Sequence, residues 1–259
     1  MEEKPIHITV LYEDTDILVV DKPAGITVNR AETTKHETTI QDWAEERLHI
    51  KYQMPNVKYG EEGWTPEQDF YVRGGIVHRL DKETSGVLIL AKNARAFVEL
   101  QRQFREREVK KVYQAFAHGK INPATGTISV PVGRLPWNGK QFGIVPGGKE
   151  SKTDYTVDTY YQFSKTKEFF SFVSLFPHSG RTHQIRVHLK YIGHPIFADF
   201  LYAGRKTSRN DRKLLARVFL HAAELRIMHP TTKKQIHFVS PLAKELQDLL
   251  DKFVIIEKV

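Results

Sequence analysis

Three segments of this chain alternate in side-chain character with a period of two, and this pattern constrains the fold more than any other feature. Residues 109–118, 155–163 and 169–176 are also rich in aromatic and β-branched side chains. Both properties are typical of antiparallel strands. Residues 87–91, Val-Leu-Ile-Leu-Ala, form a continuous apolar run that predicts a buried strand, and residues 17–20 predict another, ended by a turn at Pro23 and Gly25.

Helical spacing of apolar residues appears between these strands, whereas residues 60–75 have the glycines and acids of a surface loop. We expect four helices, in order: one starting from Thr39, one capped by Asn93, one capped by Thr182 with Gly193 just past its end, and one opened by Ser240 and Pro241. Hairpin-like strands interrupted by helices, without a regular βαβ rhythm, predict an α+β fold.

Composition excludes several classes of protein. The 259 residues include no cysteine, so disulfides and cysteine-ligated metal centres are excluded. No aliphatic run approaches the ~20 residues needed to cross a bilayer. Residues 1–5 are acidic and lack the apolar stretch of a secretion signal, so we expect a cytoplasmic protein. The formal net charge of +8 makes a polyanion the first partner to consider, although composition alone does not establish one.

Two motifs invite a functional interpretation that their residues do not support. Residues 143–150 approach a phosphate-binding loop, but Glu150 stands where a serine or threonine must reach magnesium, so a hairpin loop is favoured. Four histidines gather between His178 and His194, but they lack the zinc-ligand spacing of two histidines four residues apart with an intervening glutamate. We therefore expect no metal and no cofactor.

Three other segments place charged and polar groups beside tight turns. The first is residues 75–86, Gly-Ile-Val-His-Arg-Leu-Asp-Lys-Glu-Thr-Ser-Gly, which leads directly into the buried strand. The second is Lys110-Lys111-Val112-Tyr113, and the third is residues 179–188, Ser-Gly-Arg-Thr-His-Gln-Ile-Arg-Val-His. Taken singly, each has a purely structural interpretation: a capped turn, the start of a strand and a capped helix.

In this order, the three segments resemble the RluA family of RNA pseudouridine synthases. His78-Arg79-Leu80-Asp81 with Thr84-Ser85-Gly86 matches the family signature, and Asp81 falls on its catalytic aspartate. Tyr113 falls on the active-site tyrosine, and Arg186 on the active-site arginine of the third motif. The resemblance extends from about residue 11 to residue 241 and includes Asp21-Lys22-Pro23-Ala24-Gly25.

The resemblance implies a pseudouridine synthase fold, with a central mixed, mostly antiparallel sheet flanked by helices in two fused lobes. Residues 1–10 are too few for the small RNA-binding domain of many relatives, so we expect an N-terminal extension and a catalytic domain at residues 11–259. The stretch at about 31–71 is a candidate insertion. A monomer without a protein partner is expected.

The implied reaction breaks the bond between ribose C1′ and uracil N1 and rejoins the base through C5, without a cofactor. Asp81 would act as an anion in a largely dry pocket, with Arg186 as the neighbouring cation. Whether Asp81 attacks sugar or base, or removes a ribose proton, stays open. Tyr113 could stack on uracil or transfer a proton.

The implied substrate is structured ribosomal or transfer RNA, from which the target nucleotide must be flipped. Arg79 is the expected wedge that fills the vacated space. The expected RNA contacts also include His78, Arg102, Arg105, Lys110, Lys111 and Arg181, together with the basic tract at residues 205–217.

Two other functions stay open at this point. An RNA-binding protein could keep this fold without turnover, in which case Asp81 would be dispensable. A metal-dependent hydrolase could use the histidines between His178 and His194, in which case the purified protein would hold stoichiometric metal.

Overall fold

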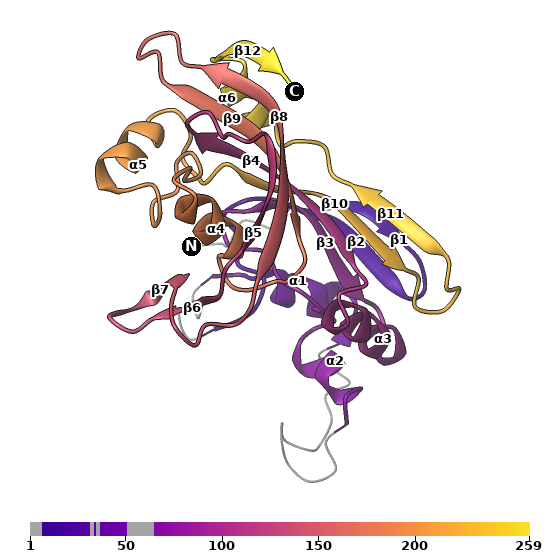
Figure 1. Cartoon of the computed structure of the whole chain (residues 1–259). Helices are drawn as coiled ribbons and strands as arrows, with labels where there is room; N and C mark the ends of the chain where they lie inside the picture. Colours follow the sequence, from indigo (N-terminus) through magenta and orange to yellow (C-terminus); the bar gives the residue numbers. More distant parts are fainter. Residues whose placement is uncertain (1–6, 32–33, 35–36, 51–64) are drawn as a thin grey trace. The chain divides into compact units, whose positions relative to one another are not determined.

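The computed structural model describes residues 7–31, 34, 37–50 and 65–259, and these residues form two compact units. Unit 1 comprises Met1–Val109 and Glu224–Ser240, and unit 2 comprises Lys110–Ala223 and Pro241–Val259 (Figure 1). The chain therefore leaves unit 1 and returns to it. The strand β10 (Leu220–Met228) contains the second crossing, because its first residues belong to unit 2 and its last residues to unit 1.

Unit 1 contains three neighbouring antiparallel strands of the main sheet and a hairpin. The order of these strands is β1 (Thr9–Glu13), β2 (Ile17–Lys22) and β3 (Ser85–Ala91), and every residue of β3 is buried. In the register, Lys22 at the end of β2 lies opposite Gly86 at the start of β3. The hairpin pairs β10 with β11 (Gln235–Val239). The two predicted strands at residues 17–20 and 87–91 are confirmed.

Two helices of unit 1, α1 and α3, begin where their sequences predict. In α1 (Ile40–Arg47), Thr39 and Asp42 form a reciprocal capping box. In α3 (Ala94–Arg105), the Asn93 side chain accepts a hydrogen bond from the Ala96 amide. The short α2 (Gln68–Val72) lies within the stretch expected as loop, so that expectation is wrong there, because a single apolar anchor, buried Phe70, suffices for five helical residues.

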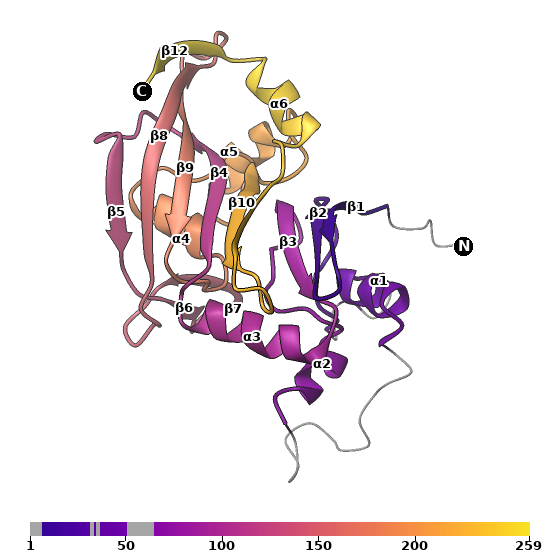
Figure 2. The ribbon, with the colours of Figure 1, turned by 90° about the vertical axis from the view of Figure 1, so that its right-hand side faces the viewer.

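Unit 2 is built on long antiparallel strands. The strands β4 (Lys110–His118), β9 (Phe169–Pro177), β8 (Lys152–Gln162) and β12 (Val254–Lys258) are neighbours in that order, and β5 (Thr125–Ser129) also pairs with β8 (Figure 2). A separate hairpin joins β6 (Val132–Leu135) to β7 (Asn138–Ile144). The three segments with period-two alternation are thus confirmed as strands.

Three helices complete unit 2: α4 (Gln184–Tyr191), α5 (Arg205–Asp211) and α6 (Lys244–Leu250). After α4, Gly193 adopts a φ of +88°. Its amide bonds the Lys190 carbonyl at 3.0 Å, and the His194 amide bonds the Leu189 carbonyl at 2.9 Å. This Schellman motif needs a left-handed residue, so the glycine predicted past the helix end is confirmed.

Two predicted helix starts are wrong. The residue before α4 is His183, with a φ of 57°, and neither its side chain nor that of Thr182 caps the helix. The final helix begins at Lys244, three residues beyond Pro241, because the backbone of Ala243, with a φ of −56° and a ψ of 140°, is not helical.

The strand β1 begins at Thr9, inside the segment expected as an extension, because Thr9 and Val10 pair with β2.

Each unit has its own core. In unit 2 the Phe116 ring is surrounded by aromatic rings at centroid distances of 5.0–5.8 Å: Tyr161, Phe170, Phe197, Phe219 and Phe253. In unit 1, α3 places Phe97 and Leu100 against the sheet. Buried aliphatic and aromatic area of this kind is the main source of folding free energy. The expected α+β architecture with antiparallel pairing is confirmed, since these eight strand pairs within the units are antiparallel: β1–β2, β2–β3, β10–β11, β4–β9, β8–β9, β5–β8, β8–β12 and β6–β7.

Candidate active site

Asp81 lies in a tight turn immediately before β3. The Thr84 amide donates to the Asp81 carbonyl at 3.0 Å, which closes the turn, and β3 begins at the next residue. Asp81 is half-buried, whereas Thr84 and Ser85 are buried. The carboxylate therefore projects from a turn that is anchored to a fully buried strand, which limits its movement.

The buried side chain of Lys22 is hydrogen-bonded to this turn. Its side chain is 0% exposed, and its Nζ donates to the carbonyl oxygens of Pro23 at 2.8 Å, Ile26 at 2.9 Å and Lys82 at 3.2 Å. The Gly25 amide also donates to the Lys82 carbonyl, at 2.7 Å. A buried ammonium group is costly unless its three protons are bonded, and here carbonyl oxygens accept them. Lys22 thus joins the turn after β2 to the turn that carries Asp81.

Gly75 allows the backbone that leads into this turn to pack closely against the end of β3. A Cβ at this position would lie 2.3 Å from the Ala91 carbonyl oxygen, and φ is +74°. The Ala91 amide donates to the Gly75 carbonyl at 2.9 Å, and Ile76 forms a bridge to Leu90. Only glycine fits this close contact between backbones, so residues 75–80 run beside the end of β3.

Tyr113 lies on β4, opposite Leu175 of β9, and packs against the core of unit 2. It is half-buried, as is Lys111, whereas Lys110 at the strand start is exposed. The strand thus presents one aromatic ring and two ammonium groups within four residues.

Arg186 is buried on α4 and is held by Asp199. The arginine Nε lies 2.7 Å from Asp199 Oδ2, and Nη2 lies 2.8 Å from Oδ1. Asp199 is 0% exposed and Arg186 is 7% exposed. This fork geometry fixes the plane of the guanidinium as well as its position. Asp199 Oδ1 also accepts from the Leu201 and Tyr202 amides, at 3.0 and 3.2 Å.

Tyr202 supports the same arginine from another side. The guanidinium carbon of Arg186 lies 5.0 Å from the centre of the Tyr202 ring, a cation–π contact. The Tyr202 hydroxyl contacts His183 Nδ1 at 2.8 Å and accepts from the Phe142 amide at 3.1 Å. Phe142 on β7 and His183 at the start of α4 therefore both contact Tyr202, the residue that supports Arg186.

The turn before α4 is ordered by Gln184. Its Oε1 accepts from the Ser179 hydroxyl at 2.7 Å and from the Arg181 amide at 3.0 Å. Its Nε2 donates to Lys152 O and Thr153 Oγ1, on β8. Because Gln184 is buried, this side chain docks the third motif onto the sheet and so fixes the start of α4, where Arg186 follows two residues later.

The residues predicted to contact RNA have different surroundings. Arg79 is exposed and has no hydrogen bond or ion pair within the described part of the chain. Arg105 is exposed, with a 3.7 Å contact to Glu106, and Arg181 donates to the Glu150 carbonyl. His78 stacks on Phe104 with centroids 4.6 Å apart and accepts from the Ile89 amide.

Arg102 is surrounded by acids on α3 and just after it. Its guanidinium is paired with Glu99 and Glu108 at 3.0 and 2.8 Å, and also with Glu106. Three carboxylates more than compensate its charge, so a contact between Arg102 and RNA stays a prediction.

Asp81 belongs to unit 1, whereas Tyr113 and Arg186 belong to unit 2. The ion pair between Asp81 and Arg186 therefore stays a prediction, whereas the anchoring of each residue within its own unit is observed.

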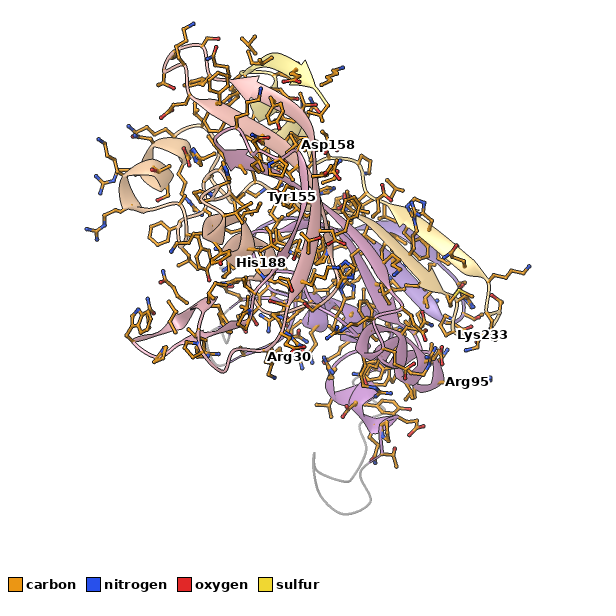
Figure 3. The ribbon with its side chains drawn as sticks, viewed as in Figure 1. Arg30, Arg95, Tyr155, Asp158, His188 and Lys233 are labelled. Atoms are coloured by element: carbon orange, nitrogen blue, oxygen red, sulfur yellow. The ribbon has the colours of Figure 1, made fainter. Side chains whose placement is uncertain are left out.

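The histidines from His178 to His194 have separate partners. His178 contacts Asp154 at 2.6 Å, His183 contacts Tyr202, and His194 contacts the His118 carbonyl at 2.8 Å. His188 lies within the fold (Figure 3), 3.0 Å from Ser151 and from Thr153, and burial lowers its pKa. A neutral imidazole in contact with hydroxyl groups has a structural role there.

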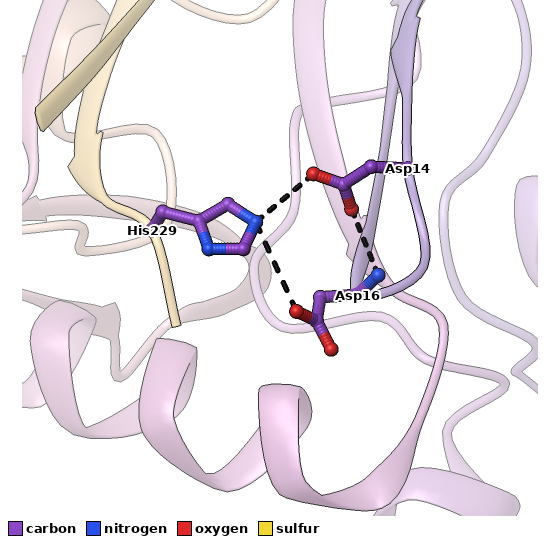
Figure 4. A group of neighbouring side chains, drawn as sticks. All are labelled: Asp14, Asp16 and His229. Atoms are coloured by element: carbon purple, nitrogen blue, oxygen red, sulfur yellow. Dashed lines mark hydrogen bonds and ion pairs between the residues drawn. The ribbon is translucent and has the colours of Figure 1, made fainter. Parts of the chain in front are cut away.

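One group of possible metal ligands lies elsewhere, where Asp14, Asp16 and His229 approach one another (Figure 4). His229 Nε2 lies 2.9 Å from Asp14, and its Nδ1 accepts from the amides of Thr231 and Thr232. The second oxygen of Asp14 accepts two backbone amides. Because both ring nitrogens and both carboxylate oxygens are bonded, the group links the β1–β2 turn to the loop after β10.

Within the described residues, no helix is long and apolar enough to cross a membrane.

Comparisons with known proteins identify the class. A family model described as RNA pseudouridylate synthase matches residues 16–191, which include Asp81, Tyr113 and Arg186. The chain belongs to this family of RNA pseudouridine synthases and is therefore an isomerase, which confirms the resemblance seen in its motifs.

Individual relatives agree with this assignment. An uncharacterized RNA pseudouridine synthase of Chlorobaculum parvum is 37% identical over 95% of this chain and 74% of that protein. Ribosomal large subunit pseudouridine synthase D of Neisseria meningitidis is 35% identical over 95% of this chain, which spans 61% of that protein. The structure of human RNA pseudouridylate synthase domain containing 1 has a TM-score of 0.71 and 28% identity, covering 100% of this chain and 93% of that one. The predicted pseudouridine synthase fold is thus confirmed.

Sequence reasoning missed three residues that organise the site: Lys22, Asp199 and Tyr202. A signal for Asp199 was present, because it is a lone acid in the apolar segment Ile-Phe-Ala-Asp-Phe-Leu-Tyr. A carboxylate in such surroundings needs a cationic or hydrogen-bonding partner. Lys22 at the end of a buried strand carried the same signal.

Proposed function

We propose that this enzyme converts specific uridines of structured large-subunit ribosomal RNA to pseudouridine, with Asp81 as the catalytic carboxylate. The observation that carries the proposal is the anchored turn of Asp81 within the span of the family match. The name of the N. meningitidis relative supports a ribosomal substrate, and transfer RNA is the alternative substrate. A cytoplasmic location, where ribosomal and transfer RNA are both present, belongs to the same proposal.

The reaction conserves atoms. The C1′–N1 bond breaks, the base turns, a C1′–C5 bond forms, N1 gains a proton and C5 loses one. Asp81 stabilises or bonds the cleaved fragment, whereas Arg186, oriented by Asp199, supplies a fixed positive charge for the aspartate and the base. Tyr113 supplies a ring face for uracil and a hydroxyl group for proton transfer at C5.

The flipped nucleotide leaves a gap in the RNA helix. Arg79 is exposed and is two residues before Asp81, so its guanidinium can stack in that gap while the aspartate faces the extruded nucleoside. Exposed Lys110 and Arg105 are suited to contact phosphates, which add affinity without base specificity.

The decisive experiment measures tritium release from ribosomal RNA labelled at uracil C5, without an added cofactor. Wild type should release tritium, and Asp81→Asn should lower the rate by about a thousandfold or more while RNA binding is retained. The matched control is Glu83→Gln, a carboxylate change in the same turn that should leave most activity. Full activity in Asp81→Asn would exclude the proposed role.

The same experiment separates the competing functions. If wild-type protein binds RNA but releases no tritium from any ribosomal or transfer RNA, a binding protein without turnover is favoured. If chelation abolishes activity and the purified protein contains stoichiometric metal, the hydrolase hypothesis is favoured.

A further inference from the structure

Phe200 is an exposed aromatic side chain in the segment between α4 and α5. It is 67% exposed, although its neighbour Asp199 is fully buried and Tyr202 is 5% exposed. Exposing a phenylalanine ring to water is unfavourable, in proportion to the apolar surface exposed. A single exposed ring is ordinary, so its surroundings decide whether it has a function.

The ring of Phe200 is held on a rigid base. The carboxylate of Asp199 accepts from the amides of Leu201 and Tyr202, and the Ala203 amide donates to the Asp199 carbonyl at 3.0 Å. Because Asp199 is itself fixed by Arg186, the backbone at Phe200 is tightly restrained. The ring is thus exposed by a well-anchored turn.

One side of the ring is occupied by a cation. The guanidinium carbon of Arg212 lies 5.7 Å from the centre of the Phe200 ring. Arg212 is held by the carbonyl oxygens of Ala198 at 3.1 Å and Ala216 at 2.9 Å. The pair therefore forms a preorganised platform, with an aromatic ring backed by a positive charge.

The platform lies in a basic stretch of chain. Residues 200–217 contain six lysines and arginines and a single acid, Asp211. That acid is buried and contacts His118 at 2.9 Å, whereas Arg217 pairs with Glu245. With six basic residues against one acid, the stretch has a formal charge of +5. Figure 3 shows nitrogen-tipped side chains extending outward from α5.

Three of these cations share the outer side of α5, since Ser208 and Asp211 occupy its buried side. Arg205, Lys206 and Arg209 are exposed, and none of their side chains has an ion pair or hydrogen bond with a described residue. Residues four apart on a helix lie on the same face, so Arg205 and Arg209 project together. Such a cluster attracts a polyanion, and the aromatic ring beside it can stack on a base.

We propose that Phe200, Arg212 and the outer side of α5 form a binding surface for RNA next to the target uridine, with a flanking unpaired base stacked on Phe200 and phosphates on Arg205, Lys206 and Arg209. The inference rests on the proposed function. Phe200 directly follows Asp199, which bonds Arg186, so the platform lies one residue from the anchor of the active-site arginine. This surface acts on substrate binding, and the chemical step belongs to Asp81.

The test uses the full-length enzyme, transcribed large-subunit ribosomal RNA labelled at uracil C5, and filter binding at several salt concentrations. Phe200→Ala should raise KM about tenfold, with an unchanged single-turnover rate at saturating RNA. The combined substitution Arg205→Glu, Lys206→Glu, Arg209→Glu should weaken binding and lower the slope of log Kd against log salt by about two to three.

The controls lie in the same unit. Phe169→Ala removes another exposed ring, on β9, and Lys244→Glu, Lys252→Glu, Lys258→Glu makes the same change in net charge on α6, the residues after it and β12. Both controls should keep wild-type KM and salt dependence. Equal effects of the two triple variants would overturn the inference, because they would show general charge attraction only.

Failure of the two proposals is distinguishable. Wild-type enzyme that releases no tritium from this RNA contradicts the proposed function. Active wild type together with unchanged KM in Phe200→Ala and an unchanged salt slope in the α5 variant contradicts the binding surface alone. A fall in the single-turnover rate at saturating RNA would instead assign Phe200 to the chemical step.

Discussion

Two buried charged residues, Lys22 and Asp199, hold the candidate site residues in place: Lys22 fixes the turn that carries Asp81, and Asp199 fixes Arg186. They do so with different chemistry. The Lys22 ammonium is bonded to three carbonyl oxygens, whereas the Asp199 carboxylate holds a guanidinium and two amides. In both cases a charge is tolerated in the interior because its hydrogen bonds are made by the protein. Neither residue is itself expected to react.

Lys22→Met should destabilise the protein by about 3 kcal/mol and reduce turnover. The substitution keeps the length of the side chain but leaves buried carbonyl oxygens without their donor, including that of Lys82 in the Asp81 turn. Urea unfolding and tritium release measure the two effects. Lys82→Ala is the control, because it removes an exposed ion pair with Glu37 and keeps the carbonyl, so it should cost less than about 1 kcal/mol. Equal effects of the two variants would refute this role of Lys22.

Asp199→Asn should cost about 3 kcal/mol of stability, because it removes the negative charge of the buried carboxylate that holds Arg186 by two hydrogen bonds. Denaturant unfolding provides the measurement. The exposed pair of Lys244 and Asp248 offers a comparison, since Asp248→Asn should change stability by less than about 1 kcal/mol. A loss below that level in Asp199→Asn would show that the arginine is held by other contacts.

At the scale of elements, α3 combines a buried face with an ionic outer face. Phe97 and Leu100 pack into the core, and the Gln103 amide bonds both the carbonyl and the amide of Met228, at 2.8 and 3.0 Å. On its outer side, Glu99 pairs with Arg102 and with Lys233 at 3.2 Å. The helix is thus attached to the β10–β11 hairpin by its polar residues as well as its apolar ones.

The free energy of unfolding at acidic pH should depend on the ionisation of Glu99. Hydrogen bonds from Arg102, above all, lower the pKa of Glu99 from 4.5 to about 2. The folded state therefore binds this proton less readily than the unfolded chain, so the contribution is present above pH 4.5 and is lost as the pH falls toward 2.

Glu99→Gln should lower stability by about 1 kcal/mol at neutral pH, a modest value because solvent screens the partners. The difference from wild type should vanish near the lowered pKa, and urea unfolding as a function of pH measures it. A difference that is constant with pH would indicate a loss of packing instead.

At the scale of the whole molecule, unit 1 is assembled from two distant chain segments. Leu225, Ile227 and Phe238 from the returning segment share a core with residues of β2 and β3. The Phe238 ring also lies 5.4 Å from that of Tyr12 on β1. Folding of unit 1 therefore requires residues synthesised long after its first strands, at the entropic expense of closing a long loop.

Phe238→Ala should destabilise the protein by about 3 to 4 kcal/mol, since it empties a buried site between the two segments. Met228→Ala on the same hairpin is the control, because Met228 is 37% exposed and its removal should cost within about 0.5 kcal/mol. Thermal or urea unfolding compares them. A loss under 1 kcal/mol in Phe238→Ala would contradict the dependence of unit 1 on its second segment.

Local rules identified most of the helices and strands of this chain. Period-two segments became β4, β8 and β9, Thr39 and Asn93 cap helices, and Gly193 ends one, because backbone sterics and capping bonds act within a few residues. Motif order along the chain predicts Asp81, Tyr113 and Arg186 as site residues, and all three lie within the span of the family match.

Tertiary structure decided the long-range hydrogen-bond partners, which rules acting over a few residues cannot predict. Gln184 docks the turn before α4 onto β8, so no cap by Thr182 is needed, and Lys22 reaches a carbonyl 60 residues away. The choice of partner for a buried charge depends on which backbone and side-chain groups the fold brings within about 3 Å, and the sequence alone does not specify that proximity. The sequence thus determined the candidate reactive groups through its motifs, and the tertiary structure decided which groups hold them in place.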